Sequence, residues 1–147
     1  MVDCVLDATV VAFSNSDLAL RIPGSPLDRR LSIIEEVAAG VRRIRYNPRL
    51  LGEYEAHART FRNDVIELFF ILLESDKAYF VRRNTLCRQD FAKATSQCNW
   101  PSHDQHLLAA AKDGVDPSIF VTEVNHAVCA SRILRAFHIR VEFVGPE

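Results

Sequence analysis

Val2-Asp3-Cys4-Val5-Leu6-Asp7 opens the chain and decides its fold. The run from Val2 to Leu6 is short, apolar and rich in β-branched residues, with Asp3 as its one interruption. Such a run is typical of a strand that is buried on both faces of a parallel sheet. Asp7 follows this strand directly, and ligands of open parallel sheets bind beyond the carboxyl ends of the strands. Asp7 is therefore the first candidate site residue.

The rest of the chain alternates between strand and helix patterns. Further strands are predicted over residues 41–46, 79–81, 118–122 and 139–143, the last with the alternation of a half-exposed edge strand. Helices are predicted from Asp28 to a stop at Gly40, from an Asn47-Pro48 start, over 61–74, after a Ser102-x-x-Gln105 capping box, and over 127–137. Residues 82–101 show neither the helical nor the strand periodicity of apolar residues. The alternation predicts an α/β fold, three layers α/β/α around a mostly parallel sheet of about five strands.

Composition predicts one intracellular domain. The chain has 147 residues, 48% of them hydrophobic and 25% charged, which fits a single domain spanning 1–147. A net charge of −1 argues against a strongly basic nucleic-acid-binding chain, although it leaves room for a local basic patch. The four cysteines have no CxxC spacing, and no basic stretch precedes the first strand. The most apolar run, 65–73, is too short to span a bilayer. We therefore expect a cytoplasmic protein with reduced thiols and no membrane contact.

Four acids are expected at one end of the sheet. Asp7 and Glu123 follow strands, Asp104 opens a helix, and Glu53 lies about one turn into the helix after the second strand. Carboxylates that converge in a low dielectric repel each other unless a cation compensates them. Oxygen-only ligation favours Mg²⁺ or Mn²⁺ over zinc. By the same repulsion, Asp104→Asn is expected to stabilise the metal-free protein.

Each acid also has a structural explanation. Asp7 can serve as a turn residue at the strand end, Asp104 as a partner of the helix dipole, and Glu53 as surface decoration. The pair His103 and His106 has i, i+3 spacing, but a solvated helix face explains it better than a metal site does. It is the joint placement of the acids that favours metal binding.

Four short motifs resemble those of PIN domains and come in the same order. They are Val5-Leu6-Asp7-Ala8-Thr9-Val10-Val11 for the opening strand, 47–55 for the helix that carries the second acid, 103–111 for an Asp followed by a Leu-Ala-rich helix, and 119–123 for the last strand. The resemblance covers nearly the whole chain. No single motif is specific; their order and spacing carry the resemblance.

The resemblance implies a metal-dependent endoribonuclease that cuts single-stranded RNA. Asp7, Glu53, Asp104 and Glu123 would be the catalytic and metal-binding acids for Mg²⁺ or Mn²⁺, and Thr9 would orient Asp7. The nearest analogues, the toxin ribonucleases of toxin–antitoxin pairs, imply a homodimer and a regulatory antitoxin peptide. Near the second motif, a cluster of arginines is a candidate contact for RNA phosphates, although a solvated basic strand explains each one equally well: Arg42, Arg43, Arg45 and Arg49.

One position departs from the PIN pattern. Relatives place an Asp two residues after the Thr of the last motif, where this chain has Val124, flanked by Glu123 and Asn125. This departure supports an alternative, a catalytically weakened module that binds RNA or a protein partner without turnover. If the alignment is right, Val124→Asp should speed cleavage; if Glu123 fills the role, Glu123→Gln should abolish it.

Overall fold

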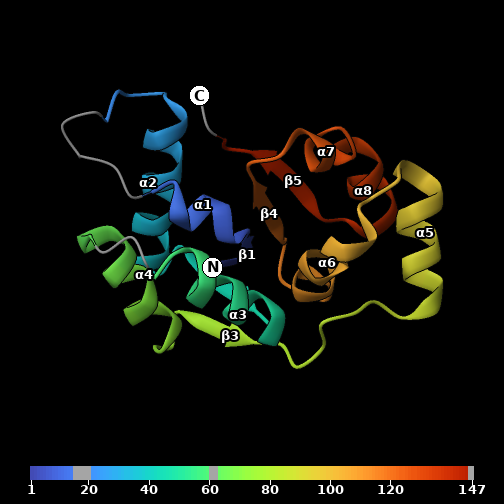
Figure 1. Cartoon of the computed structure of the whole chain (residues 1–147), viewed down its shortest axis with the longest axis horizontal. Helices are drawn as coiled ribbons and strands as arrows, with labels where there is room; N and C mark the ends of the chain where they lie inside the picture. The colour runs from blue at the N-terminus through green and yellow to red at the C-terminus, as the bar shows by residue number, and fades with distance from the viewer. Residues whose placement is uncertain (15–20, 60–62, 146–147) are drawn as a thin grey trace.

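Five parallel strands form the central sheet of the computed structural model, which describes residues 1–14, 21–59 and 63–145 (Figure 1). The strands are β1 (Val2–Leu6), β2 (Arg42–Tyr46), β3 (Ala78–Phe80), β4 (Ser118–Val121) and β5 (Arg140–Phe143). Their order is β3-β2-β1-β4-β5, and every neighbouring pair is parallel. The predicted α/β fold is confirmed. β5 is an edge strand, as its alternating pattern indicates.

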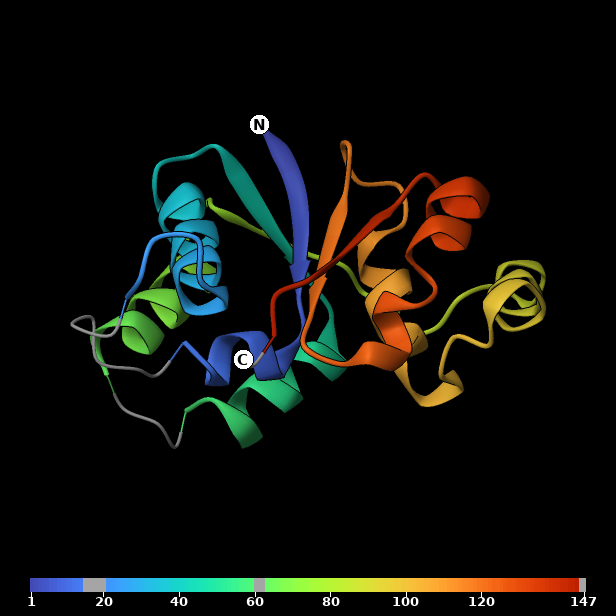
Figure 2. The same cartoon turned by 90° about the horizontal axis from the view of Figure 1, so that it is seen from above.

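Helices cover both faces of the sheet. α2 (Pro26–Ala38) packs on β2 and α4 (Asp64–Leu73) on β3, whereas α6 (Gln105–Ala111) packs on β1, β2 and β4, and α8 (Ala130–Phe137) on β5. Figure 2 shows α2 and α4 on one side of the strands and α6 and α8 on the other. The strand side chains between them form a continuous core that includes Leu6, Ile44 and Phe120.

The first three long helices start at side-chain caps. Ser25 caps α2 by accepting a hydrogen bond from the backbone N–H of Asp28, so the helix begins earlier than the predicted Asp28 start. Asn47 caps α3 (Pro48–His57) as predicted. Asn63 caps α4, and the predicted residues 61 and 62 of that helix lie outside the described residues. Gly40, at φ +81°, ends α2 in the left-handed conformation that favours glycine.

Several predictions in the second half of the chain were wrong. α5 (Arg88–Cys98) lies within residues 82–101, where no helical pattern of apolar residues was found. Of its described side chains Ala94 alone is fully buried, which explains why the helix has no such pattern. The capping box does not form: a 3₁₀ turn, η2 (Ser102–Asp104), precedes α6, and Gln105 accepts a hydrogen bond from Leu86 instead. The predicted helix over 127–137 is confirmed in α8, although it begins at Ala130, and a separate short helix, α7 (Val124–Ala127), precedes it. In the first half of the chain, the short helix α1 (Ala8–Ala12) was not predicted.

The strand order creates a switch point beside β1. From β1 the chain passes to β2 and β3 on one side and to β4 and β5 on the other, so β1 and β4 are the strands between which connections diverge. Ligands of open α/β sheets bind at such a point, beyond the carboxyl ends of the strands. Asp7 follows β1 there, and Thr122-Glu123 follows β4.

Candidate metal centre

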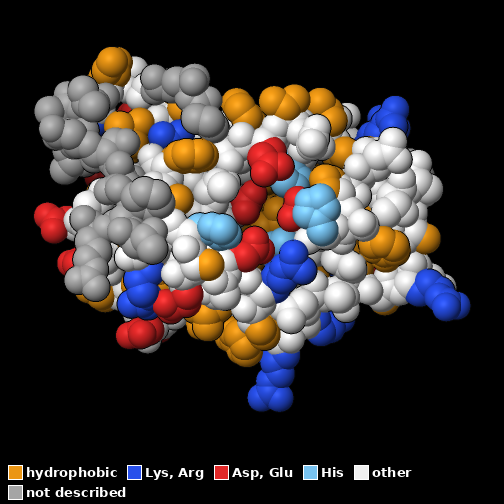
Figure 3. Space-filling view, viewed as in Figure 1, with side chains coloured by type: hydrophobic (Ala, Val, Ile, Leu, Met, Phe, Trp, Pro, Cys, Tyr) orange, Lys and Arg blue, Asp and Glu red, His pale blue; other side chains and the backbone are white. Residues whose placement is uncertain are grey.

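One cleft at this switch point is lined by all four predicted acids. It has a volume of about 330 Å³ and is bounded by α1, α3, η2 and the end of β4. Figure 3 shows acidic and histidine side chains gathered at the centre of this face. The acids come from four separate segments of the chain and line the cleft together with Ala8, Thr9, Ala12 and His57: Asp7, Glu53, Asp104 and Glu123.

Asp7 is the deepest of the four acids, with 8% of its surface exposed. It is the N-cap residue of α1, yet its carboxylate makes no capping hydrogen bond. Burial raises the pKa of Asp7 to about 6, with further raising by the charges of Asp104 and Glu53 and an opposing effect of His126. A strand-end turn residue gains nothing from such surroundings. Asp7 is thus a carboxylate whose charge the fold disfavours.

Glu53 reaches the cleft because α3 is tied down at two points. Tyr54, fully buried, donates a hydrogen bond to the backbone oxygen of Leu6 at 2.5 Å, so α3 lies against the end of β1. Asn47, besides capping α3, donates to the backbone oxygen of His106 at 2.9 Å. These bonds fix α3 between β1 and α6. Glu53 therefore faces Asp7 and does not decorate the surface.

Asp104 is held between a tryptophan and a histidine. Trp100 donates from Nε1 to the backbone oxygen of Asp104 at 3.0 Å, and the carboxylate Oδ2 lies 2.9 Å from Nε2 of His126. Burial alone would raise the pKa of Asp104, but the hydrogen bond and charge of His126, with the charges of His103 and His106, hold it below its usual value. As the N-cap of α6, Asp104 makes no side-chain capping bond. Its carboxylate is directed to the cleft side of the helix end.

Glu123 is the exposed member of the four and comes before α7. One oxygen of Glu123, one oxygen of Asp104 and one ring nitrogen of His126 lie within 4.8 Å of one another. Val124, where the sequence pattern expects an acid, is 63% exposed and does not line the cleft. Thr9 also lines it, but its hydroxyl lies 2.5 Å from that of Thr122 and, within the described ranges, makes no bond to Asp7.

The donor set suits a divalent cation. Oδ and Oε atoms of four carboxylates face a cleft in which, among the described residues, one arginine ion pair occurs, between Arg49 and Glu53 at 3.8 Å. Oε1 of Glu53 is buried and lies 2.5 Å from Nε2 of His106, but the angles between them are not those of a hydrogen bond. A buried carboxylate oxygen without a donor is costly. A bound cation would compensate both that oxygen and Asp7.

The four predicted RNA-contacting arginines are dispersed. Arg43 donates to Asp3 at 2.8 and 3.2 Å, and buried Arg45 donates to the backbone oxygens of α6 and Lys112. Arg42 pairs with Glu36 near the amino end of the sheet. Only Arg49, whose side chain is 50% exposed, lies beside one of the four acids. The first three arginines thus have contacts within the fold.

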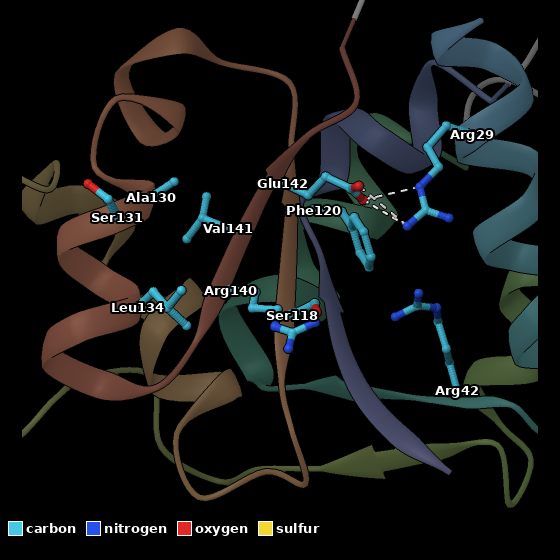
Figure 4. Close-up of a pocket in the computed structure, with 10 residues that line it drawn as sticks. All are labelled: Arg29, Arg42, Ser118, Phe120, Ala130, Ser131, Leu134, Arg140, Val141 and Glu142. Atoms are coloured by element: carbon cyan, nitrogen blue, oxygen red, sulfur yellow. Dashed lines mark hydrogen bonds and ion pairs between the residues drawn. The ribbon is translucent and has the colours of Figure 1, made fainter. Parts of the chain in front are cut away.

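A second, larger pocket of about 450 Å³ lies on the sheet face between α2 and α8 (Figure 4). Arg29 and Arg42 place their guanidinium groups 5.5 and 5.1 Å from the centre of the Phe120 ring. Arg29 also pairs with Glu142 at 3.0 Å. Since the chain itself neutralises these charges and no nucleophile or metal-ligand group gathers among the lining residues, we do not assign the chemistry to this pocket.

Two histidines that contact the predicted acids were not predicted as site residues. His106 was expected on a solvated helix face, but it is 2% exposed, whereas its neighbour His103 fits that expectation at 75% side-chain exposure. No role was predicted for His126. Its spacing from Glu123, i and i+3 directly after a strand, was the available signal, because one helical turn places both side chains on the same side.

The sequence matches no protein-family model, and it matches no curated protein and no solved structure. Within the described ranges, no helix combines the length and apolarity that crossing a membrane requires. The site must therefore be interpreted from its own chemistry.

Proposed function

We propose that this chain is a PIN-like, metal-dependent endoribonuclease that hydrolyses phosphodiester bonds of single-stranded RNA. The observation that carries the proposal is the convergence of four carboxylates, from four separate segments, on one cleft at the switch point of a parallel sheet. The order of these acids along the chain is that of the PIN motifs. By the same resemblance, the proposal includes a homodimer restrained by an antitoxin peptide.

Asp7, Glu53, Asp104 and Glu123 would hold Mg²⁺ or Mn²⁺ through their carboxylate oxygens. A divalent ion bound there supplies Lewis acidity toward a phosphate oxygen and lowers the pKa of a water molecule. Arg49, whose guanidinium lies 3.8 Å from Glu53 and is half exposed, would contact a phosphate of the RNA. The exposed Glu123 and Arg49 border the open side of the cleft, and the buried Asp7 forms its floor.

A second candidate function, RNA or protein binding without turnover, is favoured by one observation. Imidazoles already lie against two of the four acids: His126 is hydrogen-bonded to Asp104, and Nε2 of His106 lies 2.5 Å from Oε1 of Glu53. Such pairs can neutralise a carboxylate cluster without a metal. The two functions differ in one measurable property, which is metal-dependent cleavage.

The test is cleavage of an end-labelled single-stranded RNA by purified protein in Mn²⁺, in Mg²⁺ and in chelator. We expect cleavage with either metal, none in chelator, and a loss of about 100-fold or more in Asp7→Asn, equivalent to about 2.7 kcal/mol of barrier. RNA bound by wild-type protein but not cut would favour the binding module. Equal cleavage by wild type and Asp7→Asn would identify a contaminating nuclease.

Glu53→Gln and Glu55→Gln form a matched pair for this assay. Both residues lie on α3, but Glu55 pairs with Arg59 outside the cleft. Glu53→Gln should slow cleavage by about tenfold or more, and Glu55→Gln should leave it within about twofold. Similar losses in both variants would mean that charge on α3, and not a ligand position, controls the rate.

A further inference from the structure

We propose that Nε2 of His126 is a metal ligand, which makes the centre a mixed nitrogen–oxygen site for a transition ion such as Mn²⁺ or Co²⁺. The inference rests on the proposed metal centre and changes its ligand set, which the sequence predicts to be oxygen alone. It follows from where the ring of His126 lies, what holds it there and which atoms surround it.

The ligand atoms are already grouped. Nε2 of His126 lies 2.9 Å from Oδ2 of Asp104, and an oxygen of Glu123 completes a set in which all three atoms are within 4.8 Å of one another. Ligands of one ion at 2.0–2.2 Å are separated by about 3–4 Å, so this group needs only small side-chain movements to close on a cation. Asp104 and Glu123 are two of the proposed ligands, and His126 is the new one.

The imidazole is fixed in place by its surroundings. His126 is 1% exposed, and its ring packs on Trp100 with 4.8 Å between ring centroids. Trp100 also holds the backbone of Asp104 through its Nε1 hydrogen bond. One side chain thus positions both His126 and Asp104. A ligand that is held before the ion arrives loses little conformational freedom on binding.

The polar interactions of the ring run through Nε2. Nδ1 of His126 is buried and has no hydrogen-bond partner among the described residues, so the side chain is oriented by its contact with the acid cluster. Nε2 is the ring nitrogen directed at the acids.

A second buried histidine beside the acids also indicates a ligand. His106 is 2% exposed, neither of its ring nitrogens makes a hydrogen bond within the described residues, and Nε2 lies 2.5 Å from the buried Oε1 of Glu53. Two buried polar atoms that face each other without a hydrogen bond are rare in native proteins. A cation in the cleft would draw the carboxylate of Glu53 toward it and relieve this contact.

An imidazole ligand changes which ion the site prefers. Nitrogen donors favour first-row transition ions over Mg²⁺, which prefers oxygen ligands and gives up its water reluctantly. An oxygen-only site also binds Mn²⁺ or Co²⁺, so affinity for these ions is not by itself diagnostic. The diagnostic property is a directly bonded nitrogen and its dependence on His126.

The experiment is electron spin-echo spectroscopy of the full chain loaded with Mn²⁺, read out as nuclear modulation from nitrogen bonded to the ion. We expect nitrogen modulation in the wild type, a shift of its frequencies on labelling with ¹⁵N-histidine, and its loss in His126→Gln. Because the label marks every histidine, His57→Gln, whose side chain also lines the cleft, is the second variant, and its nitrogen modulation should persist. Mn²⁺ bound without nitrogen modulation would overturn the inference.

Calorimetric titrations with Mn²⁺ and Mg²⁺ give the matching affinities. His126→Gln should weaken Mn²⁺ binding about tenfold more than Mg²⁺ binding, because only the transition ion gains from the nitrogen. His103→Gln is the control: His103 is exposed and lies 3.3 Å from the same oxygen of Asp104, but outside the three-residue group, so its spectrum and affinities should match the wild type. Nitrogen modulation that persists in His126→Gln would also contradict the inference.

The RNA cleavage assay separates this inference from the proposed function. Metal-dependent cleavage without nitrogen modulation would leave the nuclease standing with an oxygen-only centre. Nitrogen modulation without cleavage would leave the metal centre standing and refute the nuclease. No binding of either ion at millimolar concentration would refute both.

Discussion

The two ends of β1 each carry a buried aspartate, and these two carboxylates differ in their charge partners and in the direction of their pKa shifts. Asp3, 1% exposed, accepts hydrogen bonds from Arg43 and from the backbone N–H of Val115, and Arg45 lies 3.8 Å away. Burial raises the pKa of Asp3. The hydrogen bonds from Arg43 and Val115, with the charges of Arg43 and Arg45, bring that pKa below its usual value. Asp7, at the other end, has no arginine or lysine ion pair within the described residues, and its pKa is raised to about 6.

This difference separates a structural acid from a candidate functional one. Around Asp3 the chain supplies the compensating cations itself, and Gly114 leaves room for them, since a Cβ there would lie 3.1 Å from both Asp3 Oδ2 and Arg45 Cδ. Around Asp7 the nearest charged groups include Glu53 and Asp104, which raise its pKa further. A fold keeps such unfavourable groups where a ligand compensates them or where they do chemistry.

The largest expected effect is the loss of stability in Asp3→Ala. Removing the carboxylate leaves the buried guanidinium of Arg45 and that of Arg43 without their acid, which should lower the free energy of unfolding by about 3 kcal/mol. Because the folded pKa of Asp3 is depressed, its contribution is present above the unfolded pKa and is lost as the pH falls through the folded pKa. Urea unfolding at pH 7 measures the loss.

Asp113→Asn is the control for this prediction. Asp113 pairs with Arg83 at 3.7 Å, but both side chains are more than 60% exposed, so the change should stay within about 0.5 kcal/mol. Equal losses in the two variants would show that Asp3 has no special structural role.

Asp7→Asn, in contrast, is expected to raise the free energy of unfolding of the metal-free protein. A carboxyl whose folded pKa is about 6, against an ordinary value of 3.8, opposes folding by roughly 2–3 kcal/mol at pH 7. This cost is complete above the folded pKa and disappears below the unfolded pKa, so Asp7→Asn should be more stable than wild type at pH 7 and equal to it at about pH 3. Unfolding in chelator across this pH range is the measurement. A less stable variant at pH 7 would contradict the comparison.

Asp104→Asn is expected to lower the stability of the metal-free protein, but by less than Asp3→Ala does. Like-charge repulsion, the only effect visible in the sequence, predicts that this change stabilises the metal-free protein. The hydrogen bond from His126 reverses that expectation, because the burial cost of Asp104 is outweighed and its pKa is lowered. Losing a charge-assisted hydrogen bond should cost about 1–2 kcal/mol. Thermal unfolding in chelator would settle the sign, and a gain in stability would restore the simpler repulsion argument.

The smallest predicted effect compares Glu123 with its neighbour Val124. Glu123 lines the cleft and lies in the group with Asp104 and His126, whereas Val124 does not line it. Glu123→Gln should slow RNA cleavage about tenfold, or 1.4 kcal/mol, and Val124→Asp should change it by less than about twofold. Rates of both variants on one labelled RNA decide the matter. Faster cleavage by Val124→Asp would mean that the cleft lacks an acid that position 124 can supply.

The strands of the sheet and the positions of the acids at their ends could be predicted from the sequence, but the contacts between side chains from distant segments could not. Buried strands and acids at their carboxyl ends leave local patterns, so β1, β4 and the positions of Asp7 and Glu123 could be predicted. Pairings between distant segments leave none: Asp104 with His126, Glu53 with His106, and Arg43 with Asp3 each depend on tertiary packing. The same limit explains why the arginines near the second motif could not be divided into structural and exposed ones.

Calorimetric titration of Mn²⁺ into wild type, Asp7→Asn and Asp113→Asn at pH 7 tests the central claim most directly. If the uncompensated acids form a metal centre, wild type and Asp113→Asn should bind Mn²⁺ with equal affinity in the submillimolar range. Asp7→Asn should bind it about tenfold more weakly or worse, a loss of at least about 1.4 kcal/mol. Binding by Asp7→Asn as tight as that of the wild type, or no binding by the wild type at millimolar Mn²⁺, would contradict the account.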